Sequence, residues 1–452
     1  MQNLNSINRR TFLQGAAAVT AGAAWLNPSW ARAEGGNKLR VVGVGVGGQG
    51  WHDINQVGEH PDTTIVGVVD VDQRAVDRSM GRFDCDGWQD FRTAFRDLAD
   101  GFDAVVVSTP DHMHAPVAMS AMNMDKHVYC QKPLTWCVAE SRALSSMAQA
   151  KTHLATQMGT QWASRGTKRQ VIAAVKDGIV GKIKKAYAWS DRPAGWWPQG
   201  VEIPAGEDAV PENLDWDLWL GVADERPYKN NTYTPFKWRG VKDFGCGAVG
   251  DMACHIADVP FYALGLTNPT SIISEANDVN DDTYPSSQNI ILTFDGSDND
   301  KIDGDSLNLY WSDGGIKPSA EDLGAPEGFE VPQNTCFLIG TEGTIGIRHE
   351  DGMAWLWKNG AAVEFEGNSR LRDRNHYHHW VDACMGWGET ETHFAFASKL
   401  TESMVLGTLA SRYPGQELLW DKQNLAFTNH QEASDTVVRR VYRDGFAPPV
   451  VG

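Results

Sequence analysis

A glycine-rich turn at residues 45–50 has the types and spacing of residues that bind a phosphate group. It follows an apolar stretch, 38–46, that predicts a buried strand, and a helix is predicted from about Trp51. Glycines at such a turn let the backbone approach a pyrophosphate and let the helix pack closely on the strand. A frame shifted to start at Gly43 also fits the pattern, but the later frame lies at the strand's end. The expected contacts come from Gly45, Gly47, Gly48, Gln49 and Gly50.

A carboxylate lies twenty residues beyond this turn. Asp70 ends a second predicted strand, 64–69. This spacing places an acidic side chain where it can bind the ribose hydroxyls of a dinucleotide. Its negative charge repels a 2′-phosphate, so NAD is the expected cofactor, while the neighbouring Arg74 leaves NADP open.

Two more predicted strands end in polar turns. Residues 102–108 lead into Thr109, Pro110 and His114, and residues 127–130 lead into Gln131 and Lys132. In a parallel sheet the carboxyl ends of the strands share one edge, where ligands bind. We therefore expect these five residues to join the glycine turn and Asp70 around the cofactor, and His112 is a further candidate there.

An acid and a histidine stand four residues apart at Asp251 and His255. On a helix this spacing puts both side chains on one face. Histidine has an ordinary pKa of about 6.5, which suits it to proton transfer near neutral pH.

Aromatic and polar residues concentrate before this pair. Flat indole rings and bidentate polar groups are typical of sugar pockets. The substrate candidates are Arg192, Trp196, Trp197, Trp238 and Arg239.

The alternation of strands and helices predicts an α/β protein with two domains. The first, 34–155, is expected to be a Rossmann domain with a doubly wound parallel sheet. The second, 156–452, is expected to be an α/β domain with an open, largely antiparallel sheet that binds substrate and a second subunit. A homodimer or homotetramer is therefore expected. Thr135 is predicted to cap the helix that runs to Ala150.

Residues 1–33 have the features of an export signal. Arg9 and Arg10 precede Phe12, a mild apolar run follows, and Ala31-Arg32-Ala33 offers a cleavage site. The arginine pair resembles a twin-arginine signal, with an ordinary secretory signal as the alternative. The expectation is a periplasmic protein without a membrane span after cleavage.

Composition excludes several classes of function. The formal net charge of −18 opposes binding to nucleic acid or to anionic lipid. The seven cysteines form no C-x-x-C pair, so no metal is expected, although one disulfide stays open. The histidine-dense run 374–380 is interpreted as a helix start with at least one histidine facing substrate.

Taken together, these motifs resemble the Gfo/Idh/MocA oxidoreductase family. The ordered matches are the glycine turn, Asp70, Thr109-Pro110 with His114, Lys132-Pro133 and the D-x-x-x-H of Asp251 and His255. The chain departs from the family's E-K-P, because Gln131 precedes Lys132. This loss of charge puts in doubt the role of the glutamate.

The resemblance implies roles for three residues. His255 would be the acid or base, Lys132 would polarise the reacting oxygen, and Asp251 would bind or orient the substrate. The implied activity is NAD(P)-dependent hydride transfer at a hydroxyl of a sugar, glycoside or polyol, with a tightly held cofactor. One alternative is an NAD-dependent glycoside hydrolase that oxidises C3 transiently. Another is a sugar- or nucleotide-binding protein without catalysis.

Overall fold

The computed structural model describes residues 38–436 and 438–448. The predicted signal segment, 1–33, lies outside these residues.

The first sheet has six parallel strands in the order β3-β2-β1-β4-β5-β6. Chain order reverses between β1 and β4, and this is the position at which open α/β sheets form a ligand crevice. The expected doubly wound parallel sheet is confirmed. The strands are β1 (Leu39–Val44), β2 (Thr63–Val69), β3 (Asp86–Trp88), β4 (Ala104–Val107), β5 (His127–Cys130) and β6 (Thr156–Met158).

Helices connect these strands. They are α2 (Gly48–Gly58), α3 (Gln73–Phe83), α4 (Phe91–Leu98), α5 (Asp111–Asn123) and α6 (Val138–Ala150). All four residues of β4 are buried, as expected for a central strand covered by helices on both faces. The strand β6 belongs to the first sheet and lies just past residue 155, the predicted end of the first domain.

The predicted helix cap at Thr135 is wrong. The N-cap of α6 is Cys137. The Thr135 hydroxyl instead donates to the Cys137 carbonyl and forms a hydrogen bond of 2.5 Å with Ser141 Oγ. The side chain of Glu140 accepts the backbone N–H groups that precede the helix.

The glycine turn is shaped by steric contacts. Gly45 has a φ of +78°, and a Cβ there would lie 2.7 Å from the Ser108 carbonyl carbon. A Cβ on Gly50 would lie 1.7 Å from the Gly45 oxygen. The turn can therefore pass close to β4 and enter α2 only with glycine at both positions, which favours the frame that starts at Gly45.

The second sheet has ten strands in the order β14-β13-β12-β11-β7-β10-β9-β8-β15-β16. Its neighbours pair antiparallel except β7 with β10, so the expected largely antiparallel sheet is confirmed. The strands are β7 (Ile183–Trp189), β8 (Ser271–Asn277), β9 (Ser287–Asp295), β10 (Ser306–Asp313), β11 (Thr335–Gly340), β12 (Thr344–Arg348), β13 (Ala354–Lys358), β14 (Ala361–Val363), β15 (Leu418–Asp421) and β16 (Ala426–Phe427).

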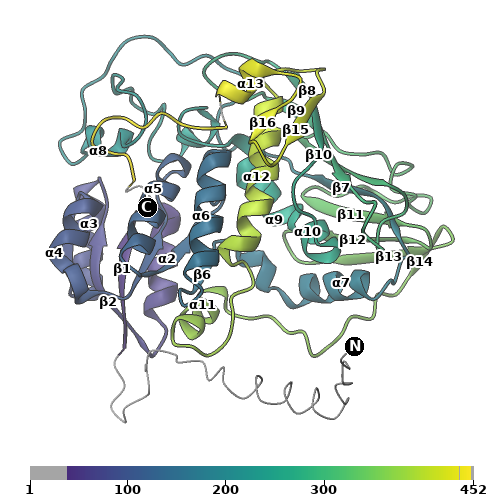
Figure 1. Ribbon diagram of the computed structural model, residues 1–452, viewed down its shortest axis with the longest axis horizontal. Helices are drawn as coiled ribbons and strands as arrows, with labels where there is room; N and C mark the ends of the chain where they lie inside the picture. The colour runs from purple at the N-terminus through teal and green to yellow at the C-terminus, as the bar shows by residue number, and fades with distance from the viewer. Residues whose placement is uncertain (1–37, 437, 449–452) are drawn as a thin grey trace, which may run out of the picture. The chain divides into compact units, whose positions relative to one another are not determined.

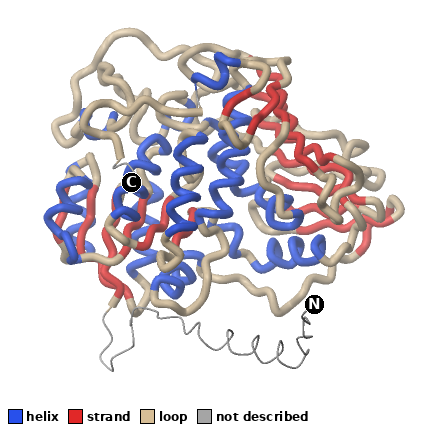
Figure 2. Tube along the Cα trace, in the orientation of Figure 1, coloured by secondary structure: helices blue, strands red, loops and turns tan. Residues whose placement is uncertain are grey.

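Helices α5, α6 and α12 (Phe394–Ala410) run side by side between the two sheets (Figure 1, Figure 2). Almost every residue of α12 is buried, because its neighbours cover it on all sides. The smaller helices α7 (Gly166–Lys176) and α10 (Asp258–Leu264) pack on the second sheet's side.

A long loop brings the second half of the chain over the first sheet. It leaves β7, includes the short helix α8 (Trp216–Leu220), and pairs with the end of β2 through an Asp72–Leu214 bridge. Figure 1 shows α8 beside the end of α3. The loop therefore covers the edge at which the strands of the first sheet end.

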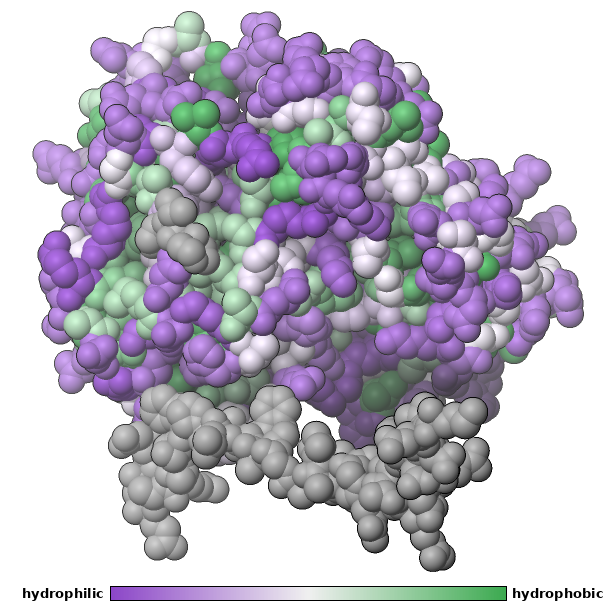
Figure 3. Space-filling model, in the orientation of Figure 1, coloured by the Kyte–Doolittle hydropathy of each residue, from purple (hydrophilic) through white to green (hydrophobic). Residues whose placement is uncertain are grey.

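Hydrophilic residues dominate the face shown in Figure 3. Within residues 38–436 and 438–448, no helix combines the length and the apolar character that a membrane span needs.

We expect Gly50→Ala to destabilise the protein, because its Cβ would force the turn away from α2. The free energy of unfolding should fall by about 1–3 kcal/mol, the usual range for overpacking. Gly81→Ala is the matched control, since Gly81 lies inside α3 with open space around it. It should gain up to about 1 kcal/mol. Urea unfolding measures both, and equal effects of the two variants would contradict the steric argument.

Candidate active site

A cavity of about 840 Å³ opens at the carboxyl ends of the first sheet's strands. Its size lies within the range of ligand sites. The structure brings almost all predicted site residues into its wall: Gly45, Gly47, Gly48, Gln49, Asp70, Thr109, Pro110, His114, Gln131, Lys132, Arg192, Trp196, Trp197, Trp238, Arg239, Asp251 and His255. Gly50 is the exception, since it lies beneath the turn.

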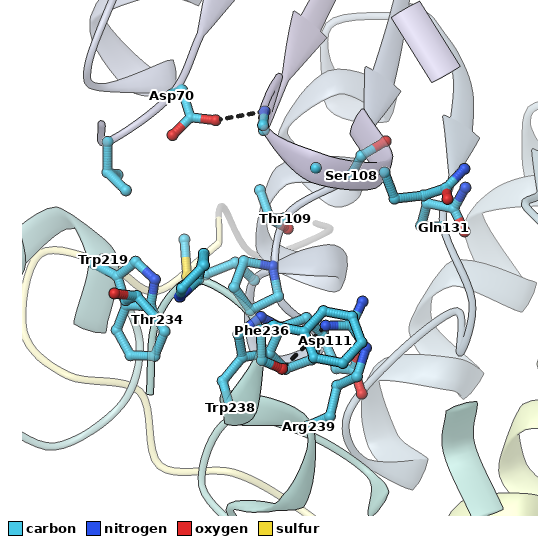
Figure 4. Close-up of a pocket in the computed structure, with 18 of the residues that line it drawn as sticks. Asp70, Ser108, Thr109, Asp111, Gln131, Trp219, Thr234, Phe236, Trp238 and Arg239 are labelled. Carbon is cyan, nitrogen blue, oxygen red and sulfur yellow. Dashed lines mark hydrogen bonds between the residues drawn. The ribbon is translucent and has the colours of Figure 1, made fainter. Parts of the chain in front are cut away.

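Asp70 lies against the glycine turn at one end of the cavity. Its Oδ2 accepts hydrogen bonds from the backbone N–H groups of Val46 and Gly47, both at 2.9 Å. Figure 4 marks one hydrogen bond at Asp70. Burial raises its pKa, while these N–H groups work against that rise. Arg74 also lines the cavity there, and it donates to the Asp72 carboxylate at 2.7 Å.

Lys132 and Asp251 meet at the other end of the cavity. Lys132 Nζ donates to Asp251 Oδ1 at 2.7 Å and to its carbonyl oxygen at 2.9 Å. Arg239 Nε lies 3.4 Å from the same Oδ1. Burial alone would raise the pKa of Asp251, but Lys132 and Arg239 outweigh it and hold that pKa below its usual value. Asp251 is therefore an anion between two cations.

The helix that carries this acid differs from the expected regular one. Asp251 lies in a π-helical turn, Val249–Ala253, and His255 lies in the α9 turn that follows, Cys254–Ile256. Such π turns are frequent at functional sites.

His255 is a neutral imidazole. Its side chain is buried, and burial together with the charge of Lys132 lowers its pKa well below the ordinary value. The pKa of His255 therefore departs from the ordinary value of histidine in this environment. Nδ1 has no hydrogen-bond partner among the described residues, and the ring lies 5.3 Å from that of His349. A neutral ring facing a cavity can accept a proton.

His114 connects two of the strand-end turns. Its Nδ1 lies 2.7 Å from the Pro133 carbonyl oxygen, and its Nε2 lies 2.9 Å from that of Thr109. Burial lowers its pKa to about 4. The ring thus fixes the backbone beside Lys132.

Other predicted histidines do not reach the cavity. His112 is fully buried among Trp219 and Phe244, with Nε2 3.2 Å from the Trp219 carbonyl. The run 374–380 starts α11 (His376–Cys384), as predicted, but none of its histidines lines the cavity. The interpretation of a substrate-facing histidine there is wrong, because His376 instead bonds Ser164 and the Met158 carbonyl.

Several cavity residues were missed from the sequence. Asp111 directly follows Pro110, so its place at a strand end was a usable signal. Burial raises its pKa to about 7, and its Oδ2 accepts the Cys246 N–H at 2.9 Å. His349 comes from the end of β12, and Trp162 from the segment after β6. No local spacing connects these two with His255.

Gln131 contacts a buried acid, Asp53, on α2. The Asp53 carboxylate accepts four hydrogen bonds of 2.7 Å from neutral donors: Gln49 Nε2, Ser108 Oγ, Gln131 Nε2 and Tyr377 OH. Burial raises the pKa of Asp53. A glutamate at 131 would bring a second carboxylate against it, whereas the glutamine donates a hydrogen bond.

Aromatic rings hold the two arginines. The Arg192 guanidinium lies 3.6 Å from the centre of the Trp196 ring. That of Arg239 lies 4.1 Å from Phe236 and 4.3 Å from Trp238. Figure 4 shows Phe236, Trp238 and Arg239 together, away from Asp70.

No three His, Cys, Asp or Glu side chains gather as a metal site would need, within the part of the chain that the structure describes. The seven cysteines are unpaired.

Both halves of the chain match a known protein family. Residues 39–159 match the NAD-binding Rossmann fold of an oxidoreductase family, and residues 169–309 match its C-terminal α/β domain. The chain belongs to the Gfo/Idh/MocA oxidoreductase family. Residues 6–24 match the twin-arginine translocation signal, which indicates export by that route. The NAD-binding fold and the family resemblance are thus confirmed.

Two curated relatives cover part of the chain. A glycosyl hydrolase family 109 protein of a Shewanella strain is 25% identical over 230 residues, 45% of this chain and 50% of its own. A levoglucosan dehydrogenase of Pseudarthrobacter phenanthrenivorans is 27% identical over 184 residues, 40% of this chain and 38% of its own. The chain spans half or less of the length of these relatives.

Solved structures share the fold. An oxidoreductase domain protein from Kribbella flavida aligns with a TM-score of 0.60 at 17% identity, over 85% of this chain and 100% of its own. The WlbA dehydrogenase from Chromobacterium violaceum, solved with NADH and UDP-GlcNAcA, aligns with a TM-score of 0.60 at 14% identity, over 85% and 97%. At these identities the likeness concerns the fold alone.

We expect Gln131→Glu to destabilise the protein, because the new carboxyl would lie beside Asp53. The pKa of the new carboxyl would be raised in the folded state. The variant is therefore most stable at low pH, where this carboxyl is protonated, and it loses stability as pH rises. The free energy of unfolding should fall by about 1–3 kcal/mol at pH 8 and by less at pH 5. Denaturant unfolding at both values measures this.

The double variant Asp53→Asn/Gln131→Glu is the matched control. It restores one carboxylate and one amide in the pair, so it should be more stable than Gln131→Glu alone. If Gln131→Glu proved as stable as the parent protein at both pH values, the proposed repulsion would be wrong.

We expect turnover to lack an acid limb near pH 6.5. Because the pKa of His255 is lowered, its proton-accepting form persists as pH falls from 7.5 to 5.5. Initial rates across this range, with the bound cofactor followed at 340 nm, measure the effect. Asp111, with a pKa of about 7, also titrates there. A limb near pH 6.5 that survives in Asp111→Asn would contradict a neutral His255.

Proposed function

We propose that this protein oxidises or reduces a hydroxyl of a sugar, glycoside or polyol by hydride transfer, using a tightly held NAD. The observation that carries the proposal is the single cavity that joins a dinucleotide turn to Lys132, Asp251 and His255. The family supplies the class of reaction, and the aromatic wall supports a sugar.

The residues at the turn fit a dinucleotide. Gly45 and Gly50 leave no space for side chains, and a Cβ on Gly48 would meet nothing within 4 Å, so the backbone is open to the cavity. The Asp70 carboxylate at the turn's edge would accept ribose hydroxyls. Its negative charge disfavours a 2′-phosphate, which supports NAD over NADP.

NAD, when bound, accepts or returns the hydride at the substrate carbon. The protein's own groups handle the proton. Lys132 is a cation held in place by Asp251, so it can bind the reacting oxygen and stabilise negative charge there. The neutral imidazole of His255 can accept the hydroxyl proton. In the reverse direction, the protonated ring returns it.

Export fits a captive cofactor. We infer that the protein works in the periplasm, where free nicotinamide nucleotide is not supplied, so the cofactor would be retained and recycled in place. We also infer a homo-oligomer. Support comes from the partly buried rings of Tyr187 and Tyr310, stacked at 4.7 Å on the sheet face away from the main core.

The first test denatures the purified mature protein and identifies released nucleotide by chromatography. We expect a stoichiometric amount of NAD or NADH. Lys132→Met and His255→Asn should retain it but lose about 10²-fold or more in kcat on sugars that reduce the bound cofactor. Lys151→Gln, at an exposed ion pair, is the control. Unchanged activity in both site variants would favour a binding protein without catalysis.

A second candidate is a glycoside hydrolase that returns its hydride. The similarity to a glycosyl hydrolase family 109 protein favours it. Oxidation at C3 would acidify the C2 proton, a base would remove it as the glycosidic oxygen leaves, water would add, and the ketone would be reduced again. In D₂O this route places deuterium at C2 of the product, as NMR would detect. Net reduction of the cofactor without deuterium at C2 would favour the simple dehydrogenase.

A further inference from the structure

The substrate end of the cavity carries more positive than negative charge. Three cations line it, Lys132, Arg192 and Arg239, against two carboxylates, Asp111 and Asp251. The other carboxylates in the wall, Asp70, Asp72 and Asp90, follow β2 and β3 at the nucleotide end. This excess is unusual in a chain whose formal net charge is −18.

The two carboxylates do not cancel the cations. Asp251 is shared between Lys132 and Arg239, at 2.7 and 3.4 Å. Asp111 is buried, and its raised pKa of about 7 keeps it partly protonated at neutral pH. Arg192 pairs with Asp191 at 3.0 Å, but the Asp191 side chain is 37% exposed, so solvent screens this pair and Asp191 offsets the guanidinium charge only in part.

The histidines of the site respond to this charge. Burial is the largest cause that lowers their pKa values, and the same cations lower them further: Lys132 acts on His114, His255 and His349, Arg239 on His114, and Arg192 on His349. The histidines therefore stay neutral and leave the positive excess unchanged.

The arginines are prepared for a planar anion. Trp196 stacks on Arg192, and Phe236 and Trp238 flank Arg239, so both guanidinium planes are fixed. Fixed guanidinium groups bind carboxylate or phosphate through paired hydrogen bonds. The neighbouring indoles offer flat faces to the sugar ring.

We propose that the substrate is a sugar with an anionic substituent, a carboxylate or a phosphate, which Arg192 and Arg239 bind while Lys132 and His255 face the reacting hydroxyl. This inference rests on the proposed function and narrows its substrate class.

The test compares matched sugars on the protein with its cofactor bound. D-Glucose, D-glucuronate and D-glucose 6-phosphate form one set, and the corresponding galactose compounds form another. Binding is measured by calorimetry and turnover by absorbance at 340 nm. Within at least one set, an anionic member should bind about ten-fold or more tightly than the neutral one, since a hydrogen bond to a charged group contributes about 1.5–3 kcal/mol. That preference should shrink as salt is raised.

The carboxylate and phosphate members distinguish the two sources of charge. Tighter binding of the uronate assigns the site to acidic sugars, and tighter binding of the phosphate assigns it to sugar phosphates. Arg192→Gln should weaken binding of the preferred anion about ten-fold more than that of its neutral partner. Arg370→Gln, at an exposed arginine outside the cavity wall, should leave this ratio unchanged.

Two kinds of failure are distinguishable. Equal or tighter binding of the neutral sugar in both sets, or no binding at all, overturns the inference. The cations would then serve to stabilise negative charge on the reacting oxygen. Salt-sensitive binding of the anion without any change at 340 nm supports the anionic site but refutes the proposed redox reaction.

Discussion

The contact between Lys132 and Asp251 is the constraint on which the site depends. It joins the end of β5 to the π turn of Val249–Ala253, two segments far apart in the chain. Both groups are mostly buried, and removing one partner of such a pair typically costs about 3–5 kcal/mol, because the other charge is left uncompensated. The same bond that stabilises the packing of the two halves therefore also fixes the lysine that would bind the reacting oxygen.

Ion pairs with a buried carboxylate also connect helices elsewhere in the fold. Lys168 on α7 contacts Asp258 on α10 at 2.6 Å and also donates to the His255 carbonyl at 2.6 Å. Arg142 on α6 pairs with Glu402 on α12. Each pair connects helices that are distant in sequence, and each satisfies a charge that burial would otherwise penalise. The backbone of His255 is thus held by Lys168, which pairs with Asp258, while Lys132 makes the surroundings of its ring positive.

The acid Asp53 solves the same problem without a cation. Four neutral donors surround its carboxylate and connect α2, β4, β5 and α11. Because Gln131 is one of these donors, its amide is oriented from behind, and its neighbour Lys132 follows directly on the same strand end. Where the family has a glutamate, this chain has Gln131, and the fold brings the Asp53 carboxylate next to it.

The features that depend on local spacing could be recognised from the order of the residues alone. The glycine turn, Asp70, the strand-end residues and the pair Asp251–His255 could be found because backbone geometry at a turn, strand or helix requires particular residues at short intervals. The alternation of strands and helices determined the parallel sheet for the same reason. These residues do line one cavity, although their roles stay a prediction.

Contacts between distant segments, and the pKa shifts that they cause, became visible in the folded structure. It placed His349 beside His255, put Asp53 behind Gln131 and kept the histidines of residues 374–380 away from the cavity. It also decided that His255 is neutral, since burial and the charge of Lys132 set its pKa. Electrostatic environment and burial arise from packing between segments far apart in the chain, and no local pattern of residues encodes them.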